Sequence, residues 1–136
     1  MKSLYKYLIS LLLTLTFFAC DKDDDLHGVA VDDTQIPVIN IVTPLIQDTL
    51  ILGNSLKLKS SVIENDEIHH YGFWVRNKNT SKQYVSIMKH ADLATANIDT
   101  TLNLPTLTTG TVLSVQVYAT DHAGNENAKT VEVFVK

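Results

Sequence analysis

From residue 36 onward, β-branched and other apolar residues alternate with polar ones in short runs that turn residues interrupt. Such runs are typical of half-buried strands, and no stretch shows a convincing 3.6-residue helical period. The pattern therefore predicts an all-β domain over residues 36–136. We expect strands at residues 38–43, 49–52, 55–63, 68–77, 83–88, 98–104, 112–121 and 129–135.

Residues suited to turns separate these runs. The predicted breaks lie at positions 44, 53–54, 65–66, 77–81, 105, 110 and 123–125. Only residues 90–96 are expected to form a short helical turn. Seven to eight short antiparallel strands at this spacing predict an immunoglobulin-like β-sandwich with Greek-key connections.

The last third of the domain has a Gly-Thr pair, then alternating apolar positions, then an Ala-Gly-Asn turn. Residues 107–125 thereby resemble the strand E to strand G region of fibronectin type III and bacterial immunoglobulin-like domains. The positions that resemble strand C of these domains are Ile68, Tyr71, Phe73 and Val75. Leu113 stands where the family often has a corner tyrosine, and the second strand has no tryptophan. The resemblance implies a fold and no activity.

Alternation divides the late strands into a core face and an outer face. The core face is expected to hold Leu113, Val115, Val117, Ala119, Val131, Val133 and Val135. In the fold that the resemblance implies, strands C, F and G are neighbours, which would place Trp74, Tyr118 and Phe134 in one outer row. Tyr84 on the adjacent strand would extend it. Such a row suits a partner protein or stacked sugar rings, or it only pairs across strands without a ligand.

His69 and His70 follow Asp66 and Glu67, and imidazole and carboxylate groups are ligands of first-row metals. Adjacent residues of a strand point to opposite faces. We therefore expect His69 and His70 not to share an ion, and we predict no metal site and no cofactor.

A second group of oxygen ligands lies in the predicted turn before the last strand and comprises Asp121, Asn125, Glu126 and Asn127. Such ligands suit calcium. The other interpretation, which we favour, is that Asp121 and Asn125 satisfy backbone donors of the turn. The chain shows no nucleophile with its base, spaced carboxylate pair or phosphate-binding glycine loop in the required context, so we expect no enzyme activity.

Residues 1–19 have the layout of a secretory signal, with two lysines before an apolar run that ends at Ala19. As a helix, the run of residues 8–19 would rise roughly 18 Å, too short for the ~30 Å core of a bilayer. Residues 16–20 resemble the lipobox of bacterial lipoproteins, with Phe17 where the family usually has leucine. The resemblance implies cleavage before Cys20, lipidation of Cys20 and anchoring of the chain to a membrane.

Residues 20–35 are expected to form an acidic tether. Residues 21–25 resemble the lysine-plus-acidic export signal of Bacteroidetes-type lipoproteins, which implies the outer face of the outer membrane. Under the enteric sorting rule Asp21 would instead imply retention at the inner membrane. The two lysines of the leader leave 9 of the 11 basic residues against 15 acidic ones, a net charge near −6 after cleavage. This balance disfavours nucleic acid as a partner.

Cys20 is the chain's only cysteine, so a disulfide within the chain is excluded and the core alone must hold the fold. The order of leader, acidic tether and one β domain also resembles small Bacteroidetes lipoproteins of unknown function. It implies a surface-exposed, non-catalytic binding or adhesion module for a protein or a glycan. The alternative is a structural or accessory subunit of an envelope complex.

Overall fold

The computed structural model describes residues 33–53, 55–104 and 107–136, which contain strands and no helix. The strands are β1 (Val38–Thr43), β2 (Asp48–Leu50), β3 (Leu56–Asn77), β4 (Gln83–Leu102), β5 (Val112–Asp121) and β6 (Glu126–Val135). Within these described ranges, no helix is long and apolar enough to cross a membrane. The predicted all-β class is therefore confirmed for the described domain, with six strands.

The two longest strands each contain two of the predicted ones. β3 runs through 55–63 and 68–77 without interruption, and β4 joins 83–88 to 98–104. The helical turn predicted over residues 90–96 is wrong, because these residues continue β4 and pair with β3 through His90 and Leu93. Pairing with a neighbouring strand here overrides the helix propensity of Ala91, Leu93 and Ala94.

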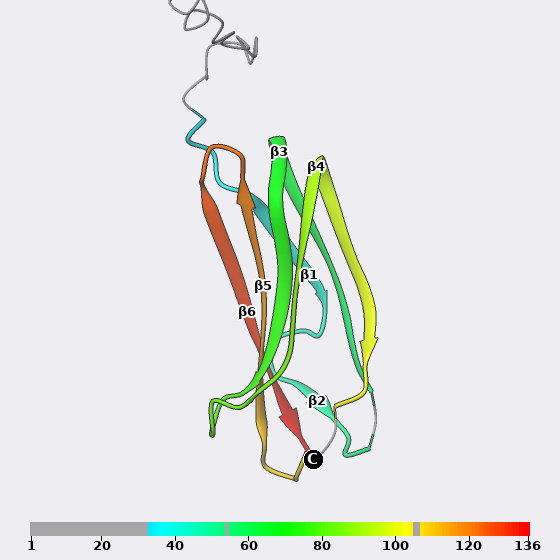
Figure 1. Cartoon of the computed structure of the whole chain (residues 1–136). Coiled ribbons are helices and arrows are strands. Elements are labelled where there is room, and N and C mark those ends of the chain that lie inside the picture. Colours follow the sequence, from blue (N-terminus) through cyan, green and yellow to red (C-terminus); the bar gives the residue numbers. More distant parts are fainter. Residues whose placement is uncertain (1–32, 54, 105–106) are drawn as a thin grey trace, which may run out of the picture. The chain divides into compact units, whose positions relative to one another are not determined.

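Both long strands pass from one layer of a sandwich to the other, and both bend at the same end of the domain (Figure 1). One layer holds β1, residues 56–63 of β3 and residues 95–102 of β4. The other holds the first part of β4, the second part of β3, then β5, β6 and β2. The bend in β3 lies where its register against β4 shifts between Ile63 and Ile68, which is the break predicted at residues 65–66.

The core lies between the two layers, and the predicted inward faces of the late strands are confirmed. Leu113, Val115, Val117 and Ala119 of β5 are buried, as are Val131, Val133 and Val135 of β6. They meet buried apolar residues of β3, namely Leu56, Leu58, Val62, Ile68, Phe73 and Val75. Each such side chain contributes about 1.5–3 kcal/mol when fully buried, which gives a domain without a disulfide its stability.

One strand departs from the predicted antiparallel arrangement. β2 pairs with β6 in parallel, with Asp48 opposite Val133 and Leu50 opposite Val135. After β1, the chain turns at residues 44–47, where Gln47 has a φ of 65° and the amide of Leu45 donates to the Asp48 carboxylate at 2.7 Å. This turn carries the chain from the three-stranded layer to the edge of the five-stranded layer.

Gly72 lies where β3, β4 and β5 approach most closely. A Cβ atom on Gly72 would lie 2.0 Å from the Ile87 carbonyl oxygen and 2.8 Å from the Tyr118 hydroxyl. Tyr118 is directly opposite Gly72 on β5, and its hydroxyl donates to the Ile87 carbonyl of β4 at 3.2 Å. The tyrosine thus reaches over β3 and ties three strands together, and its ring supplies packing that glycine lacks.

Glu64 is a buried carboxyl at the bend of β3, with 6% of its surface exposed. One carboxylate oxygen accepts the Asn65 amide at 2.7 Å, while Oε2 has no hydrogen-bond partner among the described residues. Burial raises the pKa of Glu64, the Asn65 amide lowers it, and the nearby Asp121, Asp33 and Asp66 carboxylates raise it further. Ionisation of Glu64 is therefore less favourable in the folded domain than in the unfolded chain.

Gly72→Ala should lower the free energy of unfolding by about 2 kcal/mol, because the added Cβ would overlap a backbone carbonyl that cannot rotate away. Urea denaturation of the two proteins measures this difference. Ser86→Ala, an exposed change in the neighbouring strand, is the matched control and should shift stability by less than about 0.5 kcal/mol. Equal urea midpoints for wild type and Gly72→Ala would contradict the close approach of Gly72 to the Ile87 carbonyl.

Glu64→Gln should stabilise the domain at pH 7 by about 1 kcal/mol, because it removes a buried carboxylate that lacks a full set of partners. The pKa of Glu64 is raised on folding, so wild type loses stability as pH rises from the ordinary value of 4.5 through the folded value. The advantage of Glu64→Gln should therefore grow between pH 4 and pH 7. Urea titrations in EDTA measure it, and an advantage that stays constant with pH would show that Glu64 does not titrate as described.

Candidate functional site

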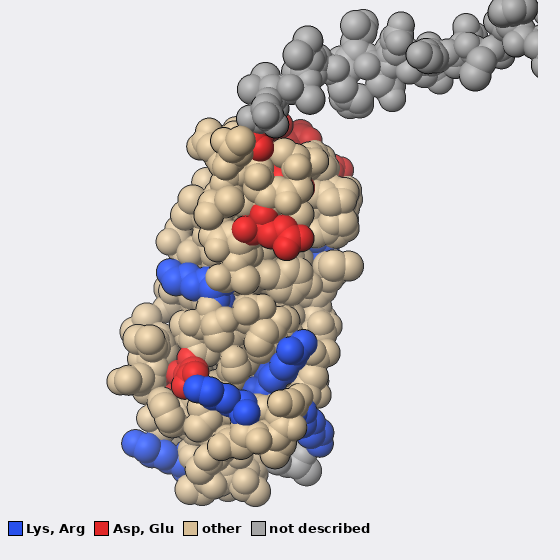
Figure 2. Space-filling model, turned by 90° about the vertical axis from the view of Figure 1, so that its left-hand side faces the viewer, with Lys and Arg blue, Asp and Glu red and all other residues tan. Residues whose placement is uncertain are grey.

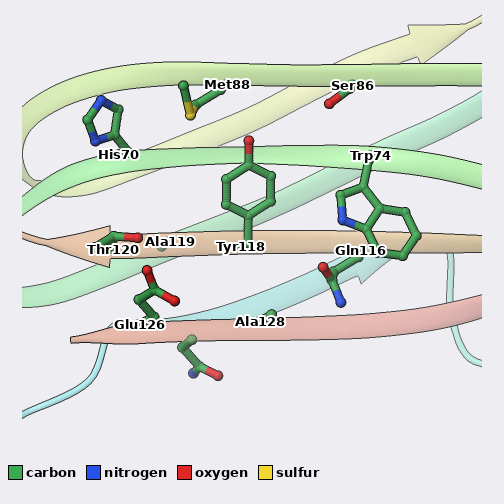
Figure 3. A pocket seen from close by; sticks show the side chains of 11 residues that line it. His70, Trp74, Ser86, Met88, Gln116, Tyr118, Ala119, Thr120, Glu126 and Ala128 are labelled. Atoms are coloured by element: carbon green, nitrogen blue, oxygen red, sulfur yellow. The ribbon is translucent and has the colours of Figure 1, made fainter. Parts of the chain in front are cut away.

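An open groove of 660 Å³ lies on the outer face of the five-stranded layer (Figure 3). Its walls come from β3, β4, β5 and β6. The lining residues are His70, Trp74, Ser86, Met88, Gln116, Tyr118, Ala119, Thr120, Glu126, Asn127 and Ala128.

The register of β3 against β5 places Trp74 and Tyr118 together in this groove. Trp74 is opposite Gln116, and Tyr118 is opposite Gly72, so the two aromatic residues are diagonal neighbours on β3 and β5. Side chains at such diagonal positions are within reach of each other when they are aromatic. Figure 3 shows the two rings beside each other with their faces toward the viewer. Both aromatic side chains line the groove.

The other two aromatic residues of the predicted row lie elsewhere. Tyr84 is the extra residue of a β-bulge, because Val85 pairs with Val75 while Gln83 pairs with Arg76. Its ring packs against the core, and its hydroxyl is 3.4 Å from the Asn77 amide nitrogen. The structure therefore separates Tyr84 from the outer face on which it was expected.

Phe134 does lie on the outer face, with 37% of its surface exposed, but not in the groove. It pairs with Val112, four residues along β5 from Gln116. At the rise of a strand this separates Phe134 from the Trp74 row by about 13 Å. Of the four predicted residues, the structure thus brings Trp74 and Tyr118 together and leaves Tyr84 and Phe134 apart.

Both aromatic side chains of the groove are held by contacts with their neighbours. The Arg76 guanidinium lies 4.2 Å from the centre of the Trp74 ring, a cation–π contact. Burial raises the pKa of the Tyr118 hydroxyl, which therefore stays protonated and donates to Ile87. Gln116 donates to the Thr130 hydroxyl at 3.0 Å. The groove is thus a preformed surface that can stack against a flat apolar ligand.

Four histidines gather at one end of the groove. The ring centre of His69 lies 4.0 Å from that of His70, 4.9 Å from that of His90 and 4.8 Å from that of His122. His70 lines the groove as well. The rings come from β3, from the middle of β4 and from the turn that follows β5.

The prediction that His69 and His70 point to opposite faces is wrong. Between Ile68 and His70, the register of β3 shifts against β5 so that His69 is an extra, bulged residue, and the register against β4 also shifts there, with the extra residue on β4. A bulge sets two successive residues against one on the partner strand and re-aims the side chain. The His-His pair is visible in the sequence. The position of His90 opposite His70 is not, because it depends on residues 90–96 forming a strand, where the sequence pattern predicts a helical turn.

Two carboxylates accompany these rings. The Asp92 carboxylate is 3.0 Å from His90 Nε2 and 3.2 Å from His122 Nε2, and the Glu67 carboxylate is 3.4 Å from His122 Nδ1. Burial lowers the pKa of His69, as do the nearby His70, His122 and His90, and Asp92 opposes this shift. His69 is therefore favoured in its neutral form, which keeps a lone pair on one ring nitrogen.

The turn between β5 and β6 is held by its own side chains: Asp121 satisfies a backbone donor as predicted, whereas the Asn125 side chain donates to Asp121 and to the Asp33 carbonyl instead. The Asp121 carboxylate accepts both the backbone amide and the side-chain amide of Asn125, each at 2.7 Å. Asn127 donates to the Pro37 carbonyl at 2.7 Å, while Glu126 lines the groove. The four residues considered for calcium therefore do not converge on one point.

Acidic residues are concentrated around this end of the domain. Figure 2 shows Asp and Glu gathered where the described chain begins, whereas most Lys and Arg lie toward the middle and the other end. One acidic trio, Asp33, Glu64 and Asp121, has carboxylate oxygens within 4.8 Å of one another. The predicted signal, the lipidation site at Cys20 and residues 20–32 of the tether lie outside the described residues.

Of the comparisons with known proteins, only the comparison with solved structures gives a match. No protein-family model matches the chain, and no curated protein matches it. Among solved structures, the chain is similar to the fibronectin(III)-like modules of Clostridium thermocellum CbhA, with 16% identity and a TM-score of 0.47 over 73% of this chain and 96% of that one. The described part of the chain is an all-β domain.

Proposed function

We propose that this chain is a non-catalytic binding module that takes a carbohydrate in its groove and is held at the cell surface by lipid on Cys20. The observation that supports this best is the pairing of Trp74 and Tyr118 in one open, preformed groove. An exposed apolar surface on a folded domain marks a place where another molecule binds.

The composition of the groove favours a sugar chain. Sugar rings offer apolar faces that stack on aromatic rings and hydroxyls that form hydrogen bonds. Around the two aromatic residues, the groove carries the polar side chains Ser86, Gln116, Thr120, Glu126 and Asn127. Its volume of 660 Å³ falls within the range of about 300–1,000 Å³ that is usual for ligand sites.

The proposed location is supported by the sequence of the leader and tether. Residues 16–20 resemble a lipobox, and residues 21–25 resemble a surface export signal. Each methylene of a lipid chain that inserts into the bilayer stabilises membrane binding by roughly 0.8 kcal/mol. Two or more chains on Cys20 would therefore hold the domain at a membrane permanently.

A partner protein is the second candidate, as in an accessory subunit of an envelope complex. It is favoured by exposed apolar side chains around β2, where Leu45, Ile46, Ile51 and Leu52 are 48–75% exposed. These residues lie outside the groove, so the two candidates predict different ligand-binding residues.

Trp74→Ala should weaken binding to the recognised glycan roughly tenfold or more, about 1.4 kcal/mol, because the central stacking surface is lost. Glycan arrays identify the ligand, and titration calorimetry measures its affinity. Phe134→Ala is the matched control, since it removes an aromatic ring from the same face outside the groove. Absence of any glycan ligand, together with a stoichiometric protein that co-purifies in mild detergent, would replace the proposal by the second candidate.

Cys20→Ser should abolish lipidation. The wild-type chain, expressed in a bacterium that processes lipoproteins, should partition into the detergent phase and begin at an acylated Cys20 by mass spectrometry. The variant should lack the mass of the acyl chains. Once its leader has been removed, it should partition into the aqueous phase instead of the detergent phase. Recovery of the wild-type chain intact from Met1, or with an unmodified thiol, would contradict the proposed anchor.

A further inference from the structure

We propose that His69, His70 and His90 bind a divalent first-row transition-metal ion that prefers nitrogen ligands, such as Zn²⁺ or Cu²⁺. Each of these histidines offers one ring nitrogen, and the three nitrogens lie within 4.8 Å of one another. The proposal does not rest on sugar binding, although His70 also lines the groove.

The distances require only a small adjustment to reach a metal-bound arrangement. Zinc–nitrogen bonds of about 2.0–2.1 Å in a tetrahedral site place two ligand nitrogens roughly 3.3 Å apart. The present separations therefore need to shorten by at most roughly 1.5 Å. The His90 side chain is 53% exposed, so its ring can rotate toward the other two.

The buried nitrogen of His69 is an independent indication of a ligand. His69 Nδ1 is buried, and it has no hydrogen-bond partner among the described residues. A buried polar atom without a partner is unfavourable, and packing of the rings against one another gives this nitrogen no partner. A metal ion bound to a lone pair on this nitrogen would supply the missing partner.

The β-bulge provides a structural reason for the cluster. Without the register shift after Ile68, His69 would face away from His70, as the sequence pattern predicted. The bulge instead brings both rings to the ring of His90, which is the residue opposite His70 on β4. Bulges frequently re-aim side chains beside functional sites.

Asp92 completes an arrangement that is common around metal ions. Its carboxylate lies 3.0 Å from His90 Nε2, and a carboxylate on one ring nitrogen orients the ring and leaves Nδ1 for the metal. Three protein ligands would leave a fourth coordination position open, and His70 places the site at the end of the groove. The surrounding acidic residues favour a cation electrostatically.

A different set of ligands at the same place would give a different pattern of variants. His69, Asp92 and His122 also offer ligand atoms within 4.8 Å of one another. We infer the three-histidine set because nitrogen donors suit Zn²⁺ and Cu²⁺, and because both ring nitrogens of His122 already lie beside carboxylates. Variants of His70 and His122 therefore distinguish the two sets, because each of these histidines belongs to only one of them.

Titration of the untagged full-length chain with Zn²⁺ and with Cu²⁺, in competition with a chromophoric chelator, tests the site. We expect one ion per chain with an affinity in the low micromolar range or tighter, no comparable binding of Ca²⁺, and a higher Tm with the ion. His70→Gln and His90→Gln should each lower the affinity at least about tenfold, and Asp92→Asn about tenfold. His122→Gln should lower it less than about threefold.

His27→Gln is the matched control, because it removes a histidine that precedes the β domain. Circular dichroism verifies that each variant folds, and the exposed His90 remains informative if a change at the half-buried His69 impairs folding. Binding that His70→Gln and His90→Gln leave unchanged, or no binding tighter than millimolar, would overturn the proposal. Trp74→Ala should retain the ion, so failure of the groove proposal and failure of the metal proposal are distinguishable.

Discussion

The pairing of β3 with β4 along both layers is the interaction on which the domain depends. The ladder extends from Leu56 opposite Leu102 to Arg76 opposite Gln83, with a register shift between Ile63 and Ile68 at the bend that separates the two layers. Because the two strands bend together, each layer receives one part of each strand, and their apolar faces meet in one core. A separate loop at each crossing would have left backbone donors and acceptors without strand partners.

The bend also gathers the chemically distinctive groups at one end. Bulged and bent backbone departs from strict alternation, so residues there no longer divide evenly between the two faces. Glu64 is buried at the bend without a full set of partners, and His69 is brought beside His70, His90 and His122. In the regular part of the same layer, Trp74 and Tyr118 instead line the open groove. Irregular and regular backbone thus present two different kinds of surface, which share His70.

Tyr118 links stability to the groove. Its hydroxyl bonds to the Ile87 carbonyl, and its ring covers Gly72, so the side chain that forms half of the aromatic surface also ties β5 to β4. These contacts hold the Tyr118 side chain in place without a ligand, and such preorganisation reduces the conformational entropy lost on binding. Trp74, held on one side by Arg76, is the part of the surface that can be altered without breaking a strand-to-strand tie.

The sequence by itself determined the strand class, nearly all strand positions and the inward faces, because alternation is a local consequence of burying one side of a strand. It also predicted Trp74 and Tyr118 on one face, and the role of Asp121 in its turn. Only the tertiary structure decided where the register shifts. One bulge turned Tyr84 toward the core, and another brought His69 beside His70. Which residue is left unpaired depends on how the neighbouring strands fit together, and a strand's own alternation carries no information about that fit.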